Sequence, residues 1–237
     1  MVERALQVQT FDGTRRHALT YPYVHPLHVI NLARETNVRV IIPSALYFLS
    51  VYPLSDILKG THPKLLAESQ SGIPRPSSTL SPGDMANYTL MYQHRIDIIL
   101  DFVRKFCGER RSYPACLWKR GNLGTPVDTG RPPDSEGPDP CTHAFAKLAS
   151  RASRSWFTRT GPFRWMLQTV NQLKNKDLRV CKICMEAFRV EVEKHRNAIW
   201  DNLPSVVGLP NWSELIEADL PGLLGEAQTR SPGRPPS

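Results

Sequence analysis

Proline positions constrain the fold of this chain more than any other feature of the sequence. The 237 residues include 21 prolines, and proline is compatible with the first turn of an α-helix but disrupts its interior. Five short segments with helical spacing of apolar residues each begin at a proline: 26–36, 43–52, 53–59, 140–156 and 162–174. The prolines therefore predict where these helices start.

A longer amphipathic helix is predicted at 81–107. Ser81 fits the N-cap, Pro82 the first helical position and Asp84 the first turn, while Gly108 marks the end. Apolar residues at steps of three and four predict one buried face, formed by Met85, Tyr88, Tyr92, Ile96, Ile99, Val103 and Phe106.

A second long helix is predicted at 179–203, with Pro204 expected to end it. Its apolar stripe consists of Met185, Phe188, Val192, Ile199 and Leu203, and His195 falls on the same stripe. We expect this histidine to be packed or hydrogen-bonded as part of the structure.

These segments together predict an all-α, irregular helical domain with two long amphipathic helices. The strand-like run 38–42 has no strong partner, so it is interpreted as a buried connector between helices. Residues 121–140 contain almost no apolar side chains and are expected to be a disordered insertion, and 218–237 a disordered tail. The helical domain is placed at 25–217, after an N-terminal remnant at 1–24.

Composition and charge narrow the protein class. A chain of 26.8 kDa that is 41% hydrophobic can build one ordinary core or two small ones. The longest apolar stretch, 38–54, carries Arg39 and is broken by two prolines, so no membrane span is predicted. No secretory signal is visible, and we therefore expect an intracellular protein, cytoplasmic or nuclear, whose five cysteines are free thiols or metal ligands.

The spacing Cys181-X-X-Cys184 is the sharpest local signal for a bound metal. Two such thiolates can share one tetrahedral zinc ion, and Cys116 and Cys141 could complete the site as a structural zinc centre. His143 and Cys107 are alternative ligands. Ordinary reduced cysteines and a redox Cys-X-X-Cys pair are the competing interpretations, the redox pair being disfavoured because no strand precedes it.

Net charge is concentrated in one segment. The whole chain carries +8, and the segment 141–182 has nine basic residues against Asp177 alone, which is also a net +8. Four aromatic residues lie among these cations: Trp156, Phe157, Phe163 and Trp165. They could stack on nucleic-acid bases beside arginine, or they could belong to the core while the cations are solvated.

Enzymatic motifs are not found in the sequence. It has no Gly-rich phosphate loop, no Gly-X-Ser-X-Gly and no His-Glu-X-X-His. Cys107 with His94 or His195 could form a nucleophile and base, but nothing local supports an activated thiol. Trp200 and Trp212 are interpreted as anchors that dock the turns following the second long helix.

Two blocks of sequence carry a resemblance to a known family. The first block begins with His25-Pro26-Leu27-His28 and continues through Ile42-Pro43-Ser44 to Tyr52-Pro53-Leu54-Ser55-Asp56-Ile57-Leu58. The second block consists of Ile199-Trp200-Asp201-Asn202-Leu203-Pro204 followed by Gly208-Leu209-Pro210-Asn211-Trp212. This order resembles the region that follows the BTB/POZ domain in fungal BTB domain-containing proteins. Too few residues precede His25 to build a BTB core, so the chain is expected to be that helical region with its BTB domain missing through truncation or loss. Dimerisation and ubiquitin-ligase recruitment, which the BTB unit can supply, do not carry over.

The sequence thus predicts a non-enzymatic module that presents a helical surface to a protein partner. The alternative is a basic module that associates with nucleic acid, with or without a structural zinc ion.

Overall fold

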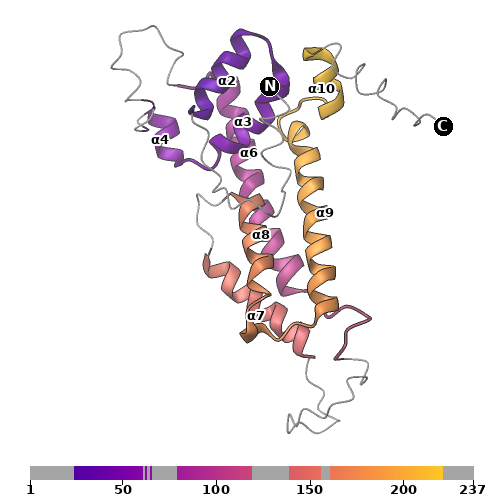
Figure 1. The fold of residues 1–237 in the computed structure, drawn as a ribbon. Coiled ribbons are helices and arrows are strands. Elements are labelled where there is room, and N and C mark those ends of the chain that lie inside the picture. Colours follow the sequence, from indigo (N-terminus) through magenta and orange to yellow (C-terminus); the bar gives the residue numbers. More distant parts are fainter. Residues whose placement is uncertain are drawn as a thin grey trace, which may run out of the picture.

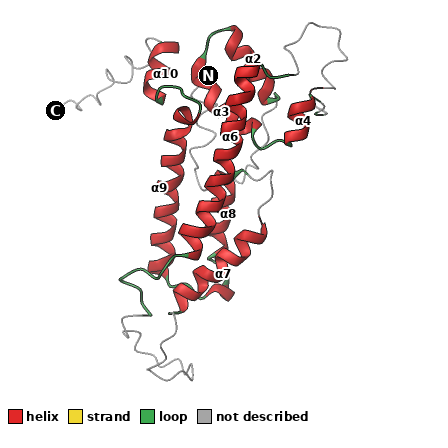
Figure 2. Cartoon of the chain, turned by 180° about the vertical axis from the view of Figure 1, so that it is seen from behind, coloured by secondary structure: helices red, strands yellow, loops and turns green. Residues whose placement is uncertain are grey.

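The computed structural model describes residues 24–60, 62, 65, 79–118, 139–155 and 161–220. Within these ranges the regular elements are all helical and no strand occurs (Figure 2), which confirms the all-α class. None of the helices described is both long and apolar enough to span a membrane.

The molecule is elongated, with some of its helices running along its length and the other elements gathered at its two ends (Figure 1). Along its length run α6 (Pro82–Asp101), α8 (Pro162–Gln172) and α9 (Lys182–Val206). One end holds α2 (Pro26–Glu35), η1 (Arg39–Ile41), α3 (Ile42–Leu49), α4 (Leu54–Lys59) and α10 (Trp212–Asp219). The opposite end holds the π-helix η2 (Phe102–Gly108), α7 (Pro140–Ser155) and η3 (Lys176–Leu178).

Helix starts follow the prolines closely. Pro26, Pro140 and Pro162 are the first residues of α2, α7 and α8. At α6 the predicted cap is present, because the Ser81 side chain accepts a hydrogen bond from the backbone N–H of Asp84 at 3.1 Å. The run 38–42 contains no strand: Arg39–Ile41 form η1 with Val40 buried, and Ile42 begins α3, which confirms the interpretation as a connector between helices.

The buried face of α6 is rotated from the predicted stripe. Tyr88 and Ile99 are buried as predicted, whereas Ile96 is only partly buried. Arg95, which was not predicted to be buried, is fully enclosed, and its guanidinium lies 4.9 Å from the centre of the Tyr92 ring. Apolar periodicity could not identify this position because the buried residue is charged.

The prediction that Pro204 ends the second long helix is wrong, since α9 continues to Val206 with Pro204 inside it. A proline cannot donate the hydrogen bond that residue 204 would give to the Trp200 carbonyl four residues earlier. The Trp212 indole N–H donates to that carbonyl instead, at 2.8 Å. The two indole rings also stack, with centroids 5.2 Å apart and an interplanar angle of 11°.

Helix α10 was not predicted, and it shortens the expected tail. Ala218 and Asp219 belong to α10, so the tail predicted at 218–237 begins too early. Asp219 accepts a hydrogen bond from the backbone N–H of Val40 at 2.6 Å, which ties α10 to η1. The insertion predicted at 121–140 ends too late, because Asp139 caps α7 and Pro140 is its first residue. Residues 1–23 of the predicted remnant, 121–138 of the predicted insertion and 221–237 of the predicted tail lie outside the described residues.

A double-mutant cycle tests the bond that replaces the missing helical bond at Pro204. We expect Trp212→Phe to lower the free energy of unfolding by about 1 kcal/mol, because it removes the donor to the Trp200 carbonyl but keeps an aromatic ring. In a Pro204→Ala background the alanine N–H can donate to the same carbonyl, so Trp212→Phe should cost less. Urea denaturation of the four proteins measures the coupling, expected at about 0.5 kcal/mol or more. Additive effects would contradict this role of the indole.

Candidate metal centre

Three separate segments bring four cysteine side chains together at one end of the molecule. Cys116 lies in the loop after η2, and Cys141 lies in the first turn of α7. Cys181 is the N-cap of α9, and Cys184 lies in its first turn. All four are buried, with at most 8% of each residue exposed.

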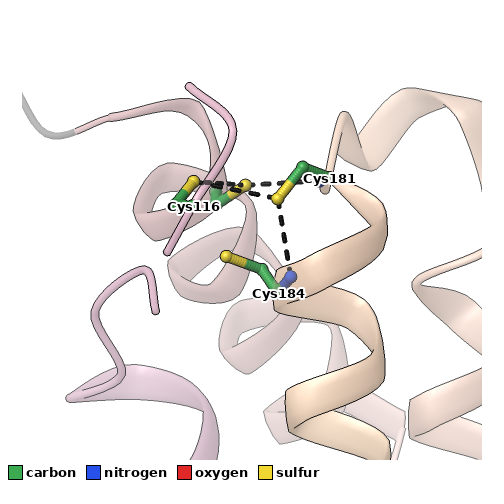
Figure 3. A group of neighbouring side chains, drawn as sticks. Cys116, Cys181 and Cys184 are labelled. Carbon is green, nitrogen blue, oxygen red and sulfur yellow. Dashed lines mark hydrogen bonds between the residues drawn. The ribbon is translucent and has the colours of Figure 1, made fainter. Parts of the chain in front are cut away.

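The four sulfur atoms occupy one small space (Figure 3). All of them lie within 4.8 Å of one another, and the labelled side chains of Cys116, Cys181 and Cys184 point toward a common centre. The Sγ of Cys116 is 3.7 Å from that of Cys141 and 3.8 Å from that of Cys181. Sulfur atoms bound to one tetrahedral zinc at about 2.3 Å are separated by about 3.8 Å. The cluster therefore has the dimensions of a tetrathiolate zinc site.

Backbone N–H groups point at the sulfur atoms. Tyr113 donates to the Sγ of Cys184 at 3.4 Å, and Cys181 donates to the Sγ of Cys141 at 3.3 Å. Cys184 donates to the Sγ of Cys181 at 3.4 Å, the N-cap bond of α9. The N-termini of α7 and α9 both meet here, and their positive dipole ends favour negative charge. These contacts favour the thiolate, the form of cysteine that binds metal, and act against the effect of burial.

The cysteines differ in acidity. Burial raises the pKa of Cys184 to about 12 and raises the pKa of Cys141 as well. Burial acts in the same direction on Cys181, but hydrogen bonds from the backbone of Cys184 and Leu117 and from neighbouring thiols lower its pKa to about 7. Of these three thiols, Cys181 therefore ionises first. A bound cation would supply the positive charge that Cys141 and Cys184 need in order to ionise.

Arg110 and Asp139 fix the loops that carry Cys116 and Cys141. The Arg110 guanidinium lies 5.0 Å from the ring centres of both Phe145 and Phe188, and it binds Glu191 at 2.7 and 3.1 Å. Asp139 caps α7 by accepting from the N–H groups of residues 141 and 142, and it accepts from the hydroxyl of Ser112 at 2.6 Å.

Sequence reasoning named the four cysteines but not these supporting residues. The pair Asp139-Pro140, an N-cap residue followed by proline at the first helical position, was a local signal for the cap. No local signal marks Arg110, since its partners are 35 or more residues away along the chain.

The alternative ligands do not join the cluster. In the described parts of the chain the metal-competent group consists of Cys116, Cys141, Cys181 and Cys184, without His143 or Cys107. Cys107 is fully buried in η2, and burial raises the pKa of its thiol to about 12. Burial also lowers the pKa of His94 and of His195. Cys107 is therefore a protonated core residue, unsuited to act as a nucleophile. His195 packs on the ring of Phe106 at 4.3 Å, the structural role expected of it.

The basic segment predicted at 141–182 contributes residues both to the core and to the surface. Phe163 and Trp165 are 7% and 4% exposed and pack in the core, so they are not available to stack on bases. Trp156, Phe157 and Arg159 lie outside the described residues. Arg151 forms an ion pair with Asp177 at 3.8 Å, which links α7 to η3.

Comparison with protein-family models, curated proteins and solved structures finds no match to this chain.

Removing the cap at Asp139 is expected to destabilise this end of the molecule. Asp139→Ala should lower the free energy of unfolding by about 1–2 kcal/mol, because two N–H groups and the buried hydroxyl of Ser112 lose their acceptor. Asp177→Ala is the matched control, since it removes an exposed carboxylate whose ion pair contributes about 0.5 kcal/mol or less. Chemical denaturation measures both, and equal losses would contradict the role given to Asp139.

Proposed function

We propose that this protein is a non-enzymatic interaction module whose α7–α9 end is held together by a structural zinc ion. The observation that carries the proposal is the meeting of four buried sulfur atoms, all within 4.8 Å of one another, from three segments far apart in sequence.

The donor set favours zinc over other metals and favours a structural role over a catalytic one. Thiolates are soft ligands that select zinc, copper(I) or iron–sulfur clusters, and four of them in a tetrahedral arrangement are typical of structural zinc. A catalytic zinc keeps one position open for water or substrate. Here Cys116, Cys141, Cys181 and Cys184 would fill all four positions, with backbone N–H groups supporting the sulfurs from outside.

The pocket at the start of α6 also lacks the features of an active site. A pocket of about 690 Å³ lies between α2 and the start of α6 and is lined by Arg34, Ser81 and Asp84, among others. The Asp84 carboxylate accepts hydrogen bonds from Arg34 at 2.9 and 2.6 Å and from the Ser81 hydroxyl at 2.8 Å. The carboxylate oxygens of Asp84 are therefore occupied by hydrogen bonds that hold the start of α6, and this structural role explains the group.

The nature of the module follows from the sequence blocks at 25–58 and 199–212, which resemble the region after the BTB/POZ domain of fungal proteins. On that basis the helical surface is proposed to dock another protein. The tie from α10 to η1 and the stacking of Trp200 on Trp212 support this, because they make the end that carries both blocks a fixed unit.

Metal analysis of the protein purified under reducing conditions tests the zinc site. We expect about one equivalent of zinc, and a loss of several kcal/mol of stability on chelation, since a ligand present at about 1,000 times its Kd stabilises by about 4 kcal/mol. Cys184→Ser should lose most of the zinc. Cys107→Ala is the matched control, because it removes a buried cysteine outside the cluster and should retain the metal.

A folded protein with less than about a tenth of an equivalent of zinc, after expression with zinc and without chelator, would contradict the structural zinc site. Equal metal loss in the Cys184 and Cys107 variants would contradict the ligand assignment.

A pull-down with the zinc-loaded protein, with and without nuclease, tests the partner class. A protein partner should survive nuclease treatment, and it should be lost when chelation disrupts the module. Capture that disappears with nuclease would contradict a direct protein partner and point to nucleic acid as the bridge.

A further inference from the structure

The outer face of α7 combines positive charge with a lack of carboxylates. Its exposed positions include Lys147, Ser150, Ser153 and Arg154, with the partly buried Arg151 at the edge; we call these five residues the α7 basic face. Lys147, Arg151 and Arg154 follow steps of four and three, so they lie on one side of the helix over about 10 Å. Neither α7 nor α8 contains an acidic residue.

The loop before α9 extends this charge. Arg151 reaches Asp177 of η3 at 3.8 Å, and η3 packs against α7. Lys174, which lies in the chain between α8 and η3, is exposed and forms no ion pair among the described residues. The same is true of Lys147 and Arg154 on α7. Asp177 is thus the one carboxylate in the segment 141–182 that offsets the charge.

The chemistry between the cations identifies the partner class. Protein interfaces need apolar or aromatic anchors at their centre, and membrane-surface helices expose Trp, Phe or Leu on the face that enters the bilayer. The described residues with large exposed apolar side chains include none on α7 or α8, where the apolar residues face the core. Lysine and arginine separated by small hydroxyl residues are instead the groups that contact the sugar–phosphate backbone.

We propose that the α7 basic face, together with Lys174, binds the phosphate backbone of a nucleic-acid duplex without reading its sequence. Binding through base stacking is not part of the proposal, because Phe163 and Trp165 are buried in the core. The inference does not depend on the proposed zinc site, since none of its residues is a metal ligand.

Binding of the full-length protein to a random duplex of about 20 base pairs, titrated with salt from about 50 to 200 mM, tests the proposal. The test variant is Lys147→Gln/Arg154→Gln/Lys174→Gln. The control is Lys59→Gln/Lys105→Gln/Lys194→Gln, which removes the same charge from exposed lysines on α4, η2 and α9. Metal content and circular dichroism of each variant separate loss of binding from loss of structure.

We expect the wild type to weaken steeply with salt and the test variant to bind at least about tenfold more weakly at low salt. Its salt slope should be shallower by about one for each phosphate-binding cation removed. The control should change little. The proposal is overturned if the wild type does not bind duplex at low salt, if binding is indifferent to salt, or if both triple variants lose affinity equally. Loss of binding to phosphatidylserine vesicles in the test variant, with duplex binding unchanged, would assign the face to a membrane and also overturn it.

Discussion

Convergence of the four cysteines is the constraint on which the α7–α9 end depends. Cys116 and Cys141 are 25 residues apart, and Cys141 and Cys181 are 40 apart, so their meeting closes two long loops. Loop closure costs conformational entropy that rises slowly with loop length. A metal bound by all four thiolates would offset that cost at a single point. Arg110 between two aromatic rings and Asp139 at the start of α7 orient the same loops from outside, so the cluster is supported by residues other than the four cysteines.

A structural element could be predicted from the sequence where the residues that cause it are neighbours in the chain. The starts of α2, α7 and α8 follow from a single proline each, because the ring fixes the local backbone and removes only a donor that the first turn does not use. The same rule failed at Pro204, where the unpaired carbonyl of Trp200 finds a donor in Trp212, on a helix that local patterning did not reveal. The burial of Arg95 was missed for a related reason, since it depends on contacts made in the folded protein, such as the one with the Tyr92 ring.

The members of the cysteine cluster were easier to predict than the residues that surround it. Cys181 and Cys184 are marked by their spacing at a helix start, and few other cysteines remained to complete a set of four. Their distances, however, result from the packing of α7 against η2 and η3, which no spacing encodes. The number of cysteines alone does not identify the cluster. Cys107 is also a cysteine, but it lies inside the π-helix η2, where it is buried and protonated.

The distance of each cation from the four cysteines decides whether its charge could stabilise a zinc ion bound there. A tetrathiolate zinc carries a net charge of about −2, which nearby cations and helix N-termini stabilise. Lys182 adjoins Cys181 and can contribute to that balance. Arg154 is 13 residues beyond Cys141, about 20 Å along the helix axis and twice the screening length of about 8–10 Å in physiological salt. Its charge is therefore not explained by the proposed metal site, and neither is the absence of carboxylates from the whole of α7 and α8. The phosphate backbone proposed as the ligand of the α7 basic face would account for both.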